Sequence, residues 1–295
     1  MNNTERYVDL HLHSYYSDGT MSPEEIVRTA VANQVGLLAI TDHNMLAAVE
    51  ELQELAKCYD IFFISGVELD SIDQGEDIHI LGYGVDIGME SFAAFVKRNR
   101  EILDDISIRL ITDMEKDYEN ISLKDFNAFT YDRKRGGWKA LHYFMEKGLT
   151  TKLREGFTIY NQYGITNDSG DYPSIEVVLQ QIHEAGGKAI LAHPGVSIKE
   201  TDTVMFRHKL LHLLDMGFDG IECYYPTHSE EITDLCLSTC RDRGLLITTG
   251  SDCHGSFGYS QVGELKITLE QLELGDLSKH HIACGVCGEI VDKTL

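Results

Sequence analysis

The feature that most constrains this chain is a series of short apolar segments, most of which carry His, Asp or Glu at or beside one end. Several segments are apolar throughout, as in GLLAIT and KAILA, which is typical of strands buried on both faces of a sheet. In parallel α/β folds, one end of the strands is where active sites are built. The predicted strands are residues 7–12, 37–41, 61–67, 78–83, 188–192, 219–223 and 245–249.

Helical patterns lie between the predicted strands. Residues 22–32 begin with Ser22, Pro23 and Glu25, the pattern of a capping box with proline in the first turn. Residues 174–185 and 230–243 are each followed by glycine, which is a common helix stop. This alternation predicts an α/β fold with a parallel sheet, and seven strands predict a barrel of the (β/α) type with seven units.

One long gap interrupts the alternation, because about 105 residues separate the fourth predicted strand from the fifth. This length is too great for one crossover and too rich in helical pattern for a loop. We therefore predict a barrel formed by residues 1–96 and 173–295, with residues 97–172 as an inserted, mostly helical subdomain. The densest basic run lies in this insert, and its members are Arg133, Lys134, Arg135 and Lys139. They are candidates for binding a substrate phosphate, although a solvated loop end has the same pattern.

The net charge of −23 argues against partners that are long polyanions. A broad basic surface for extended nucleic acid or for an anionic membrane is not expected in so acidic a chain. No apolar run reaches the length of a membrane span, and no secretory signal is visible. Seven cysteines without an export signal favour a reduced, cytoplasmic setting, and the pair Cys284 and Cys287 has no second pair to complete a zinc site.

The titratable groups at the strand ends form a predicted metal site. His11 and His13 are two residues apart on a strand, so their rings face the same side. A mixture of imidazoles and carboxylates suits Mn, Zn or Fe better than Ca or Mg. Nine candidate ligands are enough for two or three divalent ions. The candidates are His11, His13, Asp18, His43, Glu68, His79, His193, Asp252 and His254.

Six motifs together resemble those of the PHP (polymerase and histidinol phosphatase) superfamily. They are DLHLHS with SDG, TDHN, GVE, IHILGYG, AHPG and GSDCHG, and they extend over nearly the whole chain. The resemblance implies a distorted (β/α)7 barrel with a trinuclear site of manganese, iron or zinc. Within the superfamily the chain looks most like stand-alone phosphoesterases with an inserted helical subdomain, a group that includes nucleotide phosphoesterases and RNA 5′-exonucleases.

The resemblance also implies how the ligands are shared. One ion would take His11, His13, Glu68 and Asp252; a second would take Glu68, His79 and His193; a third would take Asp18, His43 and His254. The chain departs from relatives of the exonuclease type at Val196, where those relatives often have arginine after AHPG. The insert is therefore expected to supply more of the positive charge that holds the substrate.

The predicted activity is metal-dependent hydrolysis of a phosphoester by a metal-activated hydroxide. The expected partner is a small phosphorylated substrate: a phosphomonoester, a nucleotide or a 5′-phosphorylated short oligonucleotide. Asp252 or His254 would relay the proton, and His228 would protonate the leaving group, although His228 also fits a helix N-terminal position. The alternatives are a phosphatase of the histidinol-phosphate type, an amidohydrolase-like metal hydrolase, and a metal-binding module without catalysis.

Overall fold

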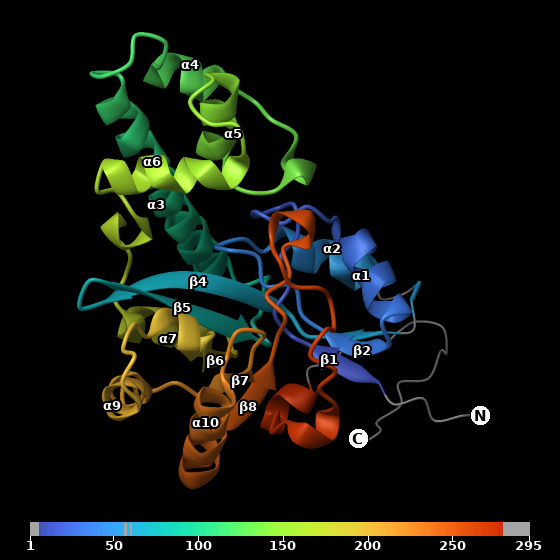
Figure 1. The fold of residues 1–295 in the computed structure, drawn as a ribbon. Helices are drawn as coiled ribbons and strands as arrows, with labels where there is room; N and C mark the ends of the chain where they lie inside the picture. The colour runs from blue at the N-terminus through green and yellow to red at the C-terminus, as the bar shows by residue number, and fades with distance from the viewer. Residues whose placement is uncertain (1–5, 56–57, 60, 280–295) are drawn as a thin grey trace.

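The computed structural model describes residues 6–55, 58–59 and 61–279, which form a mixed α/β fold (Figure 1). Cys284 and Cys287 lie outside the described residues. The described strands lie close to the predicted positions, except that the third predicted strand divides into two. They are β1 (Tyr7–Asp9), β2 (Val35–Leu38), β3 (Phe62–Phe63), β4 (Gly66–Asp73), β5 (Glu76–Tyr83), β6 (Lys188–Leu191), β7 (Gly220–Tyr224) and β8 (Leu246–Thr249).

The strands form two sheets, and within the described ranges no closed barrel is present. One sheet has the order β1-β2-β3 and is parallel; the other has the order β4-β5-β6-β7-β8. Single parallel bridges join the two sheets at Leu12 with Cys253 and at His43 with Glu68. The predicted seven-stranded barrel is therefore not confirmed, whereas the α/β class is.

The prediction of a parallel sheet is wrong at β5, which runs antiparallel to both β4 and β6. Only Gln74 and Gly75 separate β4 from β5, and both have positive φ. A two-residue loop of this kind closes a hairpin, whereas a parallel pair needs a crossover of a dozen or more residues. The hairpin places His79 of β5 opposite Asp70 of β4. The N-terminal half of β5 therefore lies beside the strand ends that carry the other predicted ligands.

Helices cover the two sheets and bury a separate apolar core against each. The helix α1 (Pro23–Ala32) begins with the predicted capping box at Ser22, and with α2 (Ala47–Leu55) it covers the three-stranded sheet. The larger core lies around the five-stranded sheet. The helices that contribute to it are α7 (Ile175–Glu184), α9 (Thr203–Leu214), α10 (Glu230–Arg243) and the first turns of α3 (Glu90–Met114). The short α8 (Pro194–Ser197) follows β6.

The segment between β5 and α7 is helical and has an apolar core of its own. In Figure 1 its helices lie above the sheets, and the long α3 connects them to β4 and β5. They are α3 (Glu90–Met114), α4 (Leu123–Ala128), α5 (Lys139–Glu146) and α6 (Gly156–Gln162). That residues 97–172 form a subdomain stays our prediction. No helix of the described residues has both the length and the apolar character needed to cross a bilayer.

Candidate metal centre

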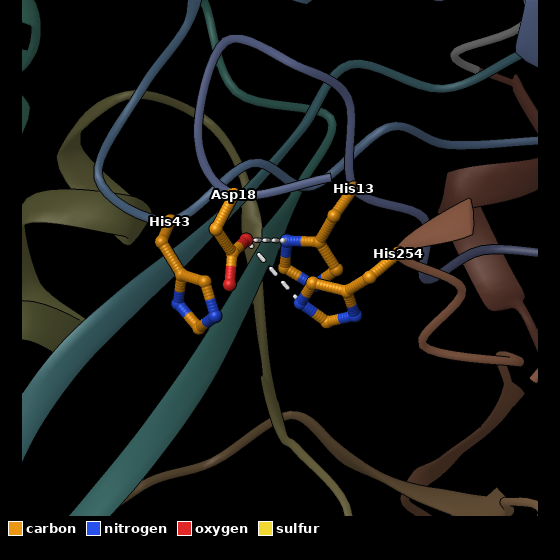
Figure 2. Close-up of side chains that lie close together, drawn as sticks. All are labelled: His13, Asp18, His43 and His254. Atoms are coloured by element: carbon orange, nitrogen blue, oxygen red, sulfur yellow. Dashed lines mark ion pairs between the residues drawn. The ribbon is translucent and has the colours of Figure 1, made fainter. Parts of the chain in front are cut away.

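The predicted ligands meet where the two sheets are joined. His11 and His13 follow β1, and His43 follows β2. Glu68 lies on β4 and His79 on β5, the two strands of the hairpin. His193 follows β6, while Asp252 and His254 follow β8. Figure 2 shows how three imidazoles and a carboxylate from these separate segments point toward one another.

All nine candidate ligands fall into groups whose ligating atoms lie within 4.8 Å of one another. A tenth residue, Asp70, belongs to one of these groups. The four groups are His13, Asp18, His43 and His254; His11, His13 and Asp252; His11, Glu68 and His193; and His43, Asp70 and His79. The structure brings the nine predicted residues together, whereas their role as ligands and their division among ions stay predictions.

Glu68 is the carboxylate that contacts most of the imidazoles in this centre. Its two carboxylate oxygens lie 2.9–3.3 Å from nitrogens of five imidazoles, those of His11, His13, His43, His79 and His193. The side chain is 1% exposed. A carboxylate so far from water is stable only if cations or protonated groups compensate its charge. These contacts agree with the expectation that Glu68 is shared between ions, which stays a prediction.

Two features of the imidazoles fit a metal better than a hydrogen-bonded network. Nε2 of His11 and Nε2 of His13 are 3.1 Å apart, so two ring nitrogens face each other. Nδ1 of His13 is buried and has no hydrogen-bond partner among the described residues. Buried polar atoms normally have partners. The buried donor set, made of imidazole nitrogens and carboxylate oxygens, fits divalent ions such as Mn, Fe or Zn.

The electrostatics of the metal-free centre show how strongly it attracts positive charge. Burial lowers the pKa of His13, but hydrogen bonds and charge interactions with Asp252 and Glu68 outweigh this effect and raise its pKa to about 10. Burial works against ionisation of Glu68, yet the surrounding imidazoles hold its pKa well below its usual range. The carboxylates thus favour protons on His11, His13 and His79, whose pKa values are raised. Divalent cations can replace those protons.

Asp70 and Glu222 are the two residues of this region that the sequence-based prediction missed. Oδ1 of Asp70 lies 3.3 Å from Nε2 of His79, and burial raises the pKa of Asp70 to about 7. Glu222 of β7 accepts from Nδ1 of His11 through one oxygen and from the His193 backbone N–H through the other. Asp70 had a usable signal, because residues two apart on a strand share a face and Glu68 stands two positions earlier. Glu222 had none beyond its place in a buried strand.

Two other buried carboxylates fix the loops that carry the ligands. Asp42 accepts from the backbone N–H and the hydroxyl of Ser14 and from the hydroxyl of Ser17, which anchors the segment between His13 and Asp18. Asp9 accepts from Ser251 and from the backbone N–H of Gly263. Such supporting hydrogen bonds orient metal ligands and adjust their affinity.

Asp252 and His254 stand at the more open side of the centre. The Asp252 side chain is 20% exposed, against 1% for Glu68, and its Oδ2 accepts a 2.7 Å hydrogen bond from the Tyr225 hydroxyl. Nδ1 of His254 lies 2.9 Å from the Asp252 backbone oxygen, which fixes the proton on Nδ1 and leaves Nε2 facing Asp18 at 3.2 Å. These two residues and His79, whose side chain is 16% exposed, are therefore the most accessible members of the centre.

His228 lies near the centre but is held by the backbone. Its Nε2 accepts from the Gly195 N–H at 3.0 Å, and its Nδ1 donates to the Cys223 carbonyl at 3.0 Å. Both ring nitrogens are therefore engaged, and burial lowers the pKa of the ring. This geometry favours a role in fixing the loops after β6 and β7 over the predicted role as proton donor.

The basic run of the insert divides between two environments. Arg133 and Lys139 line a cavity of about 720 Å³ beside the metal centre. Lys134 instead forms a surface ion pair with Glu25, and neither Lys134 nor Arg135 lines this cavity. The run also docks the insert, because the Gly137 N–H donates to the Asp18 carbonyl at 2.7 Å. Only part of the predicted cluster is thus placed to meet a substrate.

Comparison with known proteins gives consistent matches. The sequence profile of the PHP domain matches residues 9–190. A phosphoribosyl 1,2-cyclic phosphate 1,2-diphosphodiesterase of Eggerthella lenta is 28% identical over 85% of this chain and 95% of its own length. A 5′-3′ exoribonuclease of Haemophilus influenzae is 27% identical over 88% of this chain and 94% of its own length.

One solved structure supports the fold. It is the crystal structure of a putative metal-dependent phosphoesterase from Bifidobacterium adolescentis, which superposes with a TM-score of 0.74 at 22% identity. The match covers 90% of this chain and 94% of that one. The mixed α/β arrangement is therefore shared with a known structure over most of the chain.

Proposed function

The chain belongs to the PHP domain family and is a metal-dependent phosphoesterase, and we propose from this premise that it hydrolyses a phosphoester on a nucleotide, a ribose phosphate or the 5′ end of a short RNA. The observation that carries the proposal is a buried centre of imidazoles and carboxylates next to a cavity of about 720 Å³. Cavities of this size hold ligands as large as a nucleotide.

Two or three divalent ions, of Mn, Fe or Zn, are the proposed cofactors. His11, His13, Asp18, His43, Glu68, His79, His193, Asp252 and His254 are the proposed ligands, and Asp70 is added to them. Bound divalent cations lower the pKa of water toward neutrality and offset the charge on phosphoryl oxygens. The protein's part is to hold these donors in place, which the rigid strand ends and the buried carboxylates Asp9, Asp42 and Glu222 do.

Asp252 and His254 are the proposed catalytic residues. The Tyr225 hydroxyl holds Oδ2 of Asp252, so its Oδ1 keeps a fixed direction toward the imidazoles of His11 and His13. His254 has only Nε2 free for an ion or a proton, since its Nδ1 is committed to a backbone oxygen, so it would relay a proton only in a state where Nε2 holds no ion. Both side chains are partly exposed, at 20% for Asp252 and 15% for His254, so a phosphoryl group can reach them.

The test is a metal-dependent assay with purified protein. We expect phosphate release from nucleotides or 5′-phosphorylated oligoribonucleotides, its loss on chelation, and its recovery with Mn²⁺, Fe²⁺ or Zn²⁺. Metal content measured by plasma mass spectrometry should fall in parallel. Turnover of histidinol phosphate alone, or of amides but not phosphoesters, would contradict the proposal. Bound metal without turnover of any phosphoester would favour a metal-binding module.

A further inference from the structure

The cavity beside the metal centre has an unbalanced lining. Its carboxylates all have partners: Glu76 pairs with Lys209, Asp77 with His79, and Asp104 with Arg100. The remaining carboxylate, on Asp168, accepts from the Thr166 hydroxyl. The acidic groups of the wall are thus engaged by the protein itself.

Three of the four cations in the described wall have no carboxylate partner, the exception being Arg100. Arg133, Lys139 and Lys199 donate only to backbone carbonyls, and in the described part of the chain none of the three forms a salt bridge. Burial lowers the pKa of Lys139, as expected for an ammonium group without a counter-ion. The described wall holds four carboxylates and four cations, and the three cations without a carboxylate partner are available to an anionic ligand.

Arg100 of α3 is the most constrained of these cations. Its Nε and Nη2 each lie 3.1 Å from Oδ1 of Asp104, and its guanidinium carbon lies 5.1 Å from the centroid of the Trp138 ring. The side chain is only 17% exposed, and Nη1 is buried without a hydrogen-bond partner among the described residues. An unpaired guanidinium N–H is costly unless a ligand completes it.

Trp138 places this arginine next to the metal centre. The indole ring is near both, with its centroid 5.9 Å from that of His43 and 5.1 Å from the guanidinium carbon of Arg100. A phosphoester whose reacting phosphate contacts the metal centre would extend past Trp138 into the cavity. Arg100 would then meet the part of the substrate that is not hydrolysed.

We infer that Arg100 is a specificity-determining residue that binds a second, non-reacting anionic group of the substrate, such as another phosphate. The inference rests on the proposed function, because it takes the metal centre as the place where the first phosphate binds. Arginine forms paired, directional hydrogen bonds with phosphate oxygens, and here its plane is held by Asp104 and Trp138 before the ligand arrives. Substrates with two anionic groups should therefore be preferred over those with one.

The test uses two probes that cannot be hydrolysed. Propane-1,3-bisphosphonate carries two anionic groups and propylphosphonate carries one. Trp138 is the single tryptophan of the chain, so its fluorescence reports binding to the metal-loaded protein, and calorimetry checks the dissociation constants. We expect wild-type protein to bind the bisphosphonate at least about tenfold more tightly, and Arg100→Gln to weaken that probe about tenfold but propylphosphonate no more than about twofold.

Arg98→Gln is the matched control, because Arg98 is exposed on the same helix and does not line this cavity. It should leave both constants unchanged. Arg100→Lys provides a second variant that keeps the positive charge but loses the planar pair of guanidinium N–H donors. It should retain only part of the preference for the bisphosphonate. Equal weakening of both probes by Arg100→Gln, or no preference in the wild type, overturns the inference. Failure of the metal-loaded wild type to hydrolyse any phosphoester would instead overturn the proposed function.

Discussion

The metal centre and the insert cavity lie next to each other but are built in different ways. The centre takes its groups from strand ends, and most of them are almost fully buried and hydrogen-bonded to further buried carboxylates. The cavity takes most of its groups from the helices between β5 and α7 and from the loops that join them, where cations lie beside aromatic rings and several remain exposed. The difference separates a rigid site for chemistry from a more adaptable site for recognition.

This comparison predicts different consequences of mutation. A change in the centre alters the charge balance of a closed network, in which each carboxylate contacts several imidazoles. A change in the cavity removes one contact among several and leaves the network intact. Variants of the centre should therefore lose metal and turnover together, whereas variants of the cavity should change substrate affinity at constant metal content.

The largest effect is expected from Glu68→Gln. The amide keeps the size of the side chain but cannot compensate the charge of ions held by five imidazoles. Turnover should fall at least about 1000-fold, and metal content should fall with it. Phosphate release and plasma mass spectrometry measure the two. Glu50→Gln, on the exposed side of α2, should match the wild type. Normal metal content with turnover within tenfold of the wild type would remove Glu68 from its bridging position.

The centre could be predicted from the sequence to a much greater extent than the cavity. Buried strands are apolar, so His11, Glu68 or Asp252 at a strand end stands out against its neighbours. The hairpin at Gln74 was not predicted, because its turn lacks the Asn-Gly or Asp-Gly signal that marks such loops most strongly. The reversed direction of β5 and its pairing with β4 were missed for that reason.

The cavity could not be predicted because its residues are ordinary helix-surface residues in the sequence. Arg100 is one of several charged residues on α3, and only tertiary packing decides that it faces Trp138 while Arg98 faces solvent. The sequence-based prediction of phosphate-binding residues chose the dense basic run instead. Its composition carries no information on which side chains face inward, and Lys134 pairs with Glu25 outside the cavity.

A smaller effect in the centre is expected from Asp70→Asn. Asp70 faces His79, and its other oxygen accepts from the side-chain amide of Asn44. Loss of the charge should weaken metal affinity about 10- to 100-fold, which is typical for groups that hold or orient a ligand. Quenching of Trp138 fluorescence by Mn²⁺ measures this affinity. Asp105→Asn on the exposed side of α3 is the control. Unchanged affinity would show that the three-residue group with His43 holds no ion.

A still smaller effect is expected in the cavity, where two neighbouring lysines differ in position. Lys139 lines the cavity with its ammonium 4.7 Å from the Phe126 ring centroid, whereas Lys134 lies on the surface. Lys139→Gln should raise KM about three- to tenfold at unchanged metal content, consistent with the loss of one charged contact. Lys134→Gln should change KM less than twofold. Equal effects of the two variants would mean that general attraction by the basic run, not the cavity, holds the substrate.

The smallest effect on turnover is expected from His228→Gln, which separates support of the centre from participation in it. Both ring nitrogens of His228 bond to the backbone, so the change should remove buried hydrogen bonds worth about 1–2 kcal/mol and lower Tm by several degrees. The kcat should stay within about threefold, because neither nitrogen is free to give a proton to a leaving group. Calorimetry and a pH–rate profile measure both quantities, with His208→Gln on the exposed side of α9 as the control. A hundredfold lower kcat at unchanged Tm, with one limb of the pH–rate profile lost, would instead support His228 as the proton donor. The catalytic site would then include the loop between β7 and α10.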